Sequence, residues 1–225
     1  MLLNSIDEYK KISEWADSLV GKKMLLRTFG GKLSRFLNRL GHPVKLKILK
    51  DYTMEPDDWT IGAEYDPDLD EAGRKPFRIN FIINHHRIVP WQITKKDADE
   101  LSISLIETLV HEYQHLKQYR ARLFEVPSHT YKGSNALIDD DIELTYLSCP
   151  DEIDSYSANI AIRLYIEEHI LNITRDKEHW DLHTYYKAFG KKHPVTKELE
   201  TQIAIKLTII REKEHGKDKR AVKRS

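Results

Sequence analysis

Two histidines and a glutamate in one short segment have the residue types and the spacing for metal chemistry. The segment HEYQH begins at His111 and lies where apolar residues recur at helical spacing. Side chains at i and i+4 of a helix lie one turn apart on the same face, so His111 and His115 can reach one Zn²⁺. Glu112 then lies beside the metal, where it can take a proton from water and later pass it to a leaving amine. We therefore predict a zinc site with His111 and His115 as ligands and Glu112 as catalytic base.

A catalytic zinc site also needs a third protein ligand and an open position for water. The histidine of the metzincin continuation is missing, because Gln118 and Ala121 stand where glycine and histidine would be. Glu152 is the best candidate, since it lies on the next predicted helix after a loop long enough for the chain to return. Two histidines and a glutamate are an established catalytic zinc set. His129, closer to His115 in sequence, is the alternative third ligand.

The pattern resembles that of gluzincin metallopeptidases, and more closely a set of small metallopeptidase-like proteins encoded by phages or bacteria. These carry HExxHxxQ on one helix and a later P-x-E-x-[DE]-A segment on another. The matching residues are His111, Glu112, His115, Gln118, Pro150, Glu152 and Asp154, with Ser155 in place of the alanine. The resemblance covers about residues 77–172. It implies a zincin-like fold, bound zinc, Glu152 as third ligand, and hydrolysis of a peptide or protein substrate.

Further roles near the motif follow from neighbouring residues. Asp154 is expected to accept the free N–H of a liganding imidazole, since metal-bound histidines usually have such a partner. Tyr146, Tyr156 and His129 are candidates to stabilise the oxyanion of the tetrahedral intermediate. The resemblance further implies that the strand FRINFIIN (77–84) is an edge strand on the substrate side, with which a peptide could pair.

The periodicity of the chain predicts the elements that must position these residues. Alternating apolar residues predict strands at 44–52, 59–66 and 77–84. Helical spacing predicts helices at 5–20, 31–40, 94–123, 150–173, 181–190 and 195–213, with Thr94 and Ser148 as N-caps. Residues 124–149 are predicted to form mostly loop, and residues 211–225 are predicted to form a solvated, frayed basic tail. Strands followed by helices indicate an α+β class with a small antiparallel or mixed sheet.

These elements fit one zincin-like domain spanning residues 1–225. N-terminal helices occupy 1–41, the catalytic core about 44–173, and C-terminal helices with the basic tail 174–225.

The charge balance and the absence of long apolar runs limit the partners and the location. Lys plus Arg number 36 and Asp plus Glu number 36, so no net field attracts nucleic acid, which is an unlikely main partner. No apolar run approaches the length of a membrane span, and charges interrupt the start of the chain where a secretory signal would be apolar. The single cysteine, Cys149, cannot form an internal disulfide. We expect a cytoplasmic protein, located in the host cytoplasm if a phage encodes it, with no membrane partner.

Two functional hypotheses other than a gluzincin peptidase stay open. The chain could be a binding or regulatory module that keeps a zincin scaffold without turnover, although an intact Glu112 argues against this. It could also be a SprT-like protease with His129 as third ligand, although PSHTYKGS around that residue lacks the rest of that pattern.

Overall fold

The computed structural model describes residues 5–55, 58–84, 90–125, 140–172 and 179–222. Its chain divides into two compact units: a sheet unit, Asp7–Leu116, and a helical unit, Lys117–Ser225 with Met1–Ile6. The boundary falls inside one continuous helix, α4 (Lys95–Ala121), whose last residues belong to the helical unit. The predicted α+β class is confirmed. The single-domain arrangement stays a prediction.

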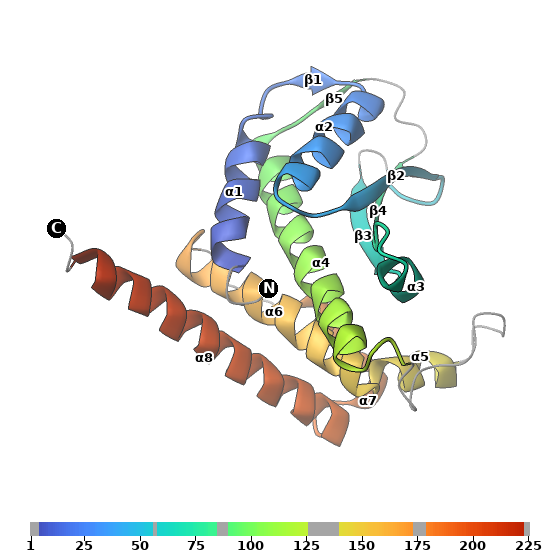
Figure 1. Cartoon of the computed structure of the whole chain (residues 1–225), viewed down its shortest axis with the longest axis vertical. Helices are drawn as coiled ribbons and strands as arrows, with labels where there is room; N and C mark the ends of the chain where they lie inside the picture. The colour runs from blue at the N-terminus through green and yellow to red at the C-terminus, as the bar shows by residue number, and fades with distance from the viewer. Residues whose placement is uncertain (1–4, 56–57, 85–89, 126–139, 173–178, 223–225) are drawn as a thin grey trace. The chain divides into compact units, whose positions relative to one another are not determined.

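The sheet unit is built around three strands, β2 (Val44–Asp51), β3 (Trp59–Tyr65) and β4 (Phe77–Asn84). Their order is β2-β4-β3, with β2 parallel and β3 antiparallel to β4, so the sheet is mixed (Figure 1). The strand predicted at the substrate-side edge, β4, is therefore the central strand, and that prediction is wrong. Its hydrogen-bonding edges are occupied by two neighbours, which leaves β2 and β3 as the edges of this sheet.

The remaining elements of the sheet unit surround this core. They are α1 (Ser5–Asp17), β1 (Lys23–Met24), α2 (Leu26–Arg39), α3 (Pro67–Glu71) and β5 (Trp91–Gln92), the last paired antiparallel with β1. The predicted strands match closely. The predicted second helix begins earlier than expected, at Leu26, because its first turn contains exposed residues outside the apolar pattern.

One face of the sheet carries the apolar core of the unit. Alternate residues of β4, from Phe77 to Ile83, are almost fully buried, as expected for a strand with a single covered face. Phe29 of α2 lies 5.0 Å from Phe81, and Tyr113 of α4 lies 4.6 Å from Phe77, measured between ring centroids. Helices α2 and α4 therefore both cover this face, and the sheet fixes the position of the motif helix (Figure 1).

The start of α4 is fixed by a reciprocal cap. The Thr94 hydroxyl accepts a hydrogen bond from the Asp97 backbone N–H at 3.1 Å, and the Thr94 N–H donates to the Asp97 carboxylate at 2.9 Å. Such paired bonds satisfy donors that the first helical turn leaves open. The prediction of Thr94 as the cap is confirmed.

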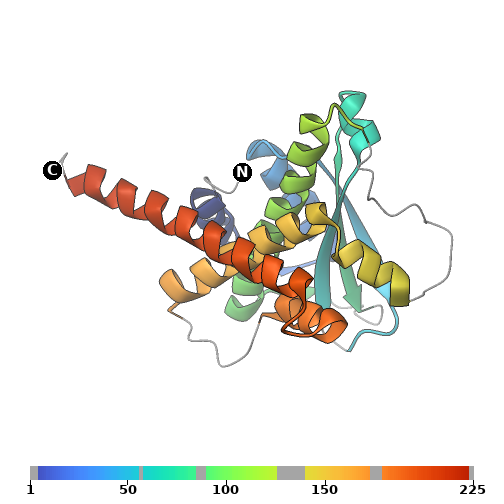
Figure 2. The same cartoon turned by 90° about the horizontal axis from the view of Figure 1, so that it is seen from below.

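The helical unit contains the end of α4 and four further helices, α5 (Asp140–Leu147), α6 (Pro150–His169), α7 (Trp180–Phe189) and α8 (Pro194–Val222). Helix α8 lies along α6, as both views show (Figures 1 and 2). In the described part of the chain, no helix is both long and apolar enough to cross a membrane.

Three local predictions for this unit need correction. Residues 140–147 form α5 instead of loop, and α8 continues to Val222 where a frayed tail was expected. Cys149, and not Ser148, is the N-cap residue of α6; the Ser148 hydroxyl donates to the Thr145 carbonyl at the end of α5 instead. Short-range patterns fail here because α5 has only eight residues, and because the end of α8, from Arg211, carries mainly charged residues.

Candidate metal centre

The two motif histidines lie together on α4, as their spacing predicts. The Nε2 atoms of His111 and His115 are 3.1 Å apart, and their ring planes are inclined at 74°. Both rings are half-buried. The Nε2 separation is that of a hydrogen bond between the two rings, and it is also close to the spacing of two nitrogen ligands on one cation.

The sequence around the motif explains this placement. Leu105, Leu109 and Val110 lie almost fully buried on α4, so the helix rests on the core just before the motif. Glu112 is only 8% exposed. Its carboxylate is therefore largely shielded from solvent, on the same helix as the two histidines.

A second polar contact anchors the motif within the sheet unit. The Tyr113 hydroxyl lies 2.9 Å from His42 Nδ1, and His42 Nε2 lies 2.5 Å from Glu8 Oε1. His42 is 3% exposed, so this chain of contacts links α1, the turn after α2, and α4 through a buried ring. Sequence reasoning missed His42, since nothing local to Gly41-His42-Pro43 indicates a partner so far along the chain.

We expect Tyr113→Phe to lower the free energy of unfolding by about 1–3 kcal/mol, because it leaves a buried imidazole nitrogen without its hydroxyl partner. Urea denaturation followed by circular dichroism measures the change. The double variant Tyr113→Phe/His42→Ala should lose less stability than the sum of the losses in the two single variants. Additive effects would show that the two side chains do not interact.

Glu152 lies in the first turn of α6 and is 8% exposed. Within the helical unit, the hydroxyl end of Tyr146 lies against Glu152 and Tyr156, although 38% of the Tyr146 side chain is exposed. Burial, and then the Glu152 carboxylate, raise the pKa of Tyr146 above its ordinary value. Tyr146 and Tyr156, both predicted to lie near the reaction centre, are thus neighbours of the predicted ligand Glu152.

Gln118 has a clear structural role in the helical unit. Its side-chain amide donates to the Asp151 carbonyl and to Asp154 Oδ2, each at 3.1 Å. Arg122, just beyond α4, adds a bidentate ion pair to the Asp151 carboxylate at 3.1 and 2.7 Å. The last turn of α4 is therefore tied to the first turn of α6, the turn that carries Glu152.

Asp154 has a second partner that sequence reasoning missed. Lys206 of α8 is 6% exposed and contacts Asp154 Oδ1, the Asp154 carbonyl at 3.0 Å and the Ser157 hydroxyl at 2.7 Å. Its position was detectable, because Lys206 falls between the buried Ile203 and Ile210 on the apolar stripe of α8. The two carboxylate oxygens of Asp154 thus contact Gln118 and Lys206, and its predicted bond to a liganding imidazole stays a prediction.

His129, the alternative third ligand, lies outside the described residues. Comparisons with protein-family models, with curated proteins and with solved structures each found no match for this chain.

Proposed function

We propose that this chain is a zinc metallopeptidase in which His111, His115 and Glu152 bind one Zn²⁺ and Glu112 acts as general base. The observation that carries the proposal is the 3.1 Å separation of the two imidazole Nε2 atoms. Two Zn–N bonds of about 2.0–2.1 Å at a tetrahedral angle put their nitrogens roughly 3.3 Å apart. The pair therefore fits a tetrahedral ion with almost no rearrangement.

Glu152 is the third ligand of the proposal. Glu152 is 8% exposed in the first turn of α6, and a glutamate completes the two-histidine donor set that the sequence predicts. Gln118, one helical turn beyond His115, holds the turn that carries Glu152. Two neutral nitrogens and one carboxylate oxygen are a donor set that zinc accepts, with a fourth position left for water.

Each proposed site residue has a distinct role in peptide hydrolysis. Bound zinc would supply Lewis-acid polarisation of the scissile carbonyl and of the attacking water. Glu112 takes the proton from that water, and its carboxylic acid returns the proton to the amine as the C–N bond breaks. The Tyr146 hydroxyl, which lies against Glu152, is a candidate donor to the developing oxyanion.

A peptide or protein is the proposed substrate, and the fold is proposed to be zincin-like. Strand pairing with substrate, if used, must involve β2 or β3, because β4 is central in its sheet. A cytoplasmic location remains part of the same proposal.

The proposal predicts one zinc per chain and chelator-sensitive peptidase activity. Protein purified from zinc-supplemented medium should contain about one equivalent of zinc by plasma mass spectrometry, because the paired imidazoles suit that ion. A random peptide library should be cleaved, cleavage should stop with 1,10-phenanthroline, and added Zn²⁺ should restore it. His169→Ala on α6 is the matched control and should keep both properties. Protein without stoichiometric transition metal would refute the site, whereas one zinc without turnover on any peptide or unfolded protein would favour a silent scaffold.

A further inference from the structure

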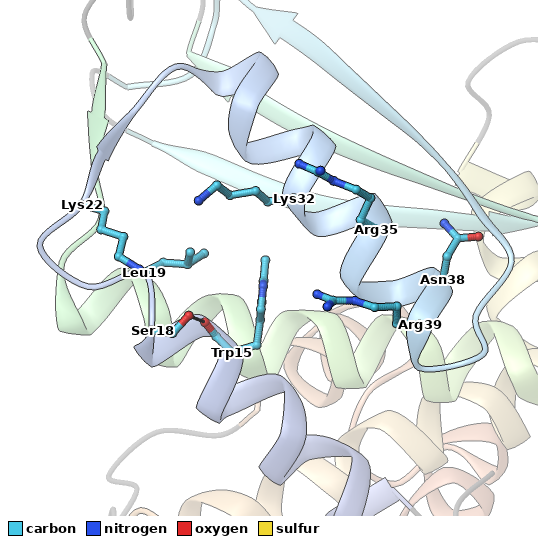
Figure 3. Close-up of a pocket in the computed structure, with 8 residues that line it drawn as sticks. All are labelled: Trp15, Ser18, Leu19, Lys22, Lys32, Arg35, Asn38 and Arg39. Carbon is cyan, nitrogen blue, oxygen red and sulfur yellow. Dashed lines mark hydrogen bonds between the residues drawn. The ribbon is translucent and has the colours of Figure 1, made fainter.

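A second candidate site lies in the sheet unit, in a cavity of about 630 Å³ between α1, the turn after it, and α2 (Figure 3). Four of its lining residues are cationic: Lys22, Lys32, Arg35 and Arg39. Its volume is within the range of small-molecule sites. None of its residues belongs to the metal centre.

The sequence places these cations on one side of a single helix. Lys32, Arg35 and Arg39 follow one another at i, i+3 and i+7 of α2, while the opposite face of the helix is buried in the core. Lys22 comes from the turn between α1 and β1 and completes the wall. The side chains of Lys32 and Arg39 extend from α2 toward Trp15, which projects into the cavity from α1 (Figure 3).

The cavity has no counter-charge of its own. Within the described residues, none of the four lining cations forms an ion pair; Arg35 donates only to the Gly31 carbonyl at 3.0 Å. Two other cations of the sheet unit do have carboxylate partners: Lys95 pairs with Asp17 at 2.6 Å and Arg78 with Glu64 at 2.8 Å. Like charges gathered without carboxylates repel one another in a chain whose total charge is zero. An anionic ligand removes that repulsion.

The cavity also offers an aromatic surface. Trp15 is half-buried and stacks on Phe36 with ring centroids 4.5 Å apart and an interplanar angle of 6°. This stacking holds the indole fixed, and buried Leu19 adds apolar surface beside it. A fixed indole among cations suits a ligand that has a flat ring as well as negative charge.

We propose that this cavity binds a polyanionic organic phosphate with an aromatic ring, a ligand of the nucleotide class. Arg35 and Arg39 can each donate two hydrogen bonds to phosphate oxygens, and Lys22 and Lys32 act as point charges. Trp15 contacts the ring. The site does not depend on the metal centre or on peptidase activity.

Isothermal titration calorimetry of the full chain with ATP, in buffer without divalent metal, tests the proposal. We expect saturable 1:1 binding with a dissociation constant below about 1 mM. The double variant Lys32→Gln/Arg39→Gln should bind ATP at least tenfold more weakly, because two charge-assisted contacts are lost. The control Lys23→Gln/Arg27→Gln removes the same net charge from neighbouring residues outside the cavity and should bind ATP as the parent does. Trp15→Leu should weaken ATP binding several-fold and leave inorganic triphosphate binding unchanged.

Each other outcome overturns the proposal. Equal losses in the two double variants would mean diffuse electrostatic attraction and no built site. If triphosphate and ATP bind equally tightly, and Trp15→Leu changes neither affinity, Trp15 does not contact a ligand ring and the proposed ligand class is wrong. A single-stranded oligonucleotide that binds far more tightly than ATP would assign the surface to nucleic acid instead, and absence of ATP binding at about 1 mM would remove the site.

Discussion

Glu112→Gln should lower the rate of peptide cleavage by about 10²- to 10⁴-fold while one zinc per chain stays bound. The substitution keeps the shape of a side chain that is 8% exposed but removes the group that accepts the proton of the attacking water. Because glutamine replaces no proposed ligand, metal affinity should not change. Initial rates on the cleaved library peptide and zinc content by mass spectrometry measure the two effects on one preparation.

Glu100→Gln is the matched control for this variant. It makes the same chemical change on the same helix, at an exposed position in the first half of α4. The control should cleave at the parent rate. Loss of zinc from the Glu112 variant would mean that Glu112 is a ligand, and full activity in that variant would mean that the base lies elsewhere.

Glu152→Ala should weaken zinc binding by at least about 10- to 100-fold, the loss typical of residues that merely support ligands, because it removes a proposed ligand and its charge. Competition with a chromophoric chelator measures the affinity directly. Glu152 is buried beside Tyr146, so thermal unfolding of the same variant in the presence of chelator separates loss of metal from loss of fold. A folded variant with unchanged affinity would remove Glu152 from the site.

His129→Ala is the decisive comparison for the third ligand. In the gluzincin arrangement it should leave zinc affinity nearly unchanged, even if cleavage slows. If the His129 variant loses zinc while the Glu152 variant keeps it, the SprT-like arrangement is the correct one. The pair of motif histidines would survive that result, since their spacing does not depend on the third ligand.

The motif and the helix that carries it were predictable because both depend on short-range geometry. A spacing of four residues puts His111 and His115 on one helical face wherever the helix lies, and the observed Nε2 separation agrees. The Thr94–Asp97 cap is equally local, and alternating apolar residues located the three strands of the sheet. Each of these features follows from residues only a few positions apart.

The tertiary structure decided what local patterns do not contain. The order of strands depends on which distant segments pair. The resemblance implied that β4 is an edge strand, whereas the structure has it between β2 and β3. His42 contacts Tyr113 of the motif helix, and Lys206 contacts Ser157 of α6. Both partners are remote in sequence, so no local pattern indicates these contacts.

The cationic cavity shows the same division. The helical positions of Lys32, Arg35 and Arg39 are readable from the sequence, but charged residues at that spacing usually only face solvent. The proposed ligands and base rest on the sequence, because these proposals depend on residue chemistry and local spacing. Trp15 and Lys22 line the same cavity as the α2 cations only through tertiary packing, because long-range contacts set which helical faces meet.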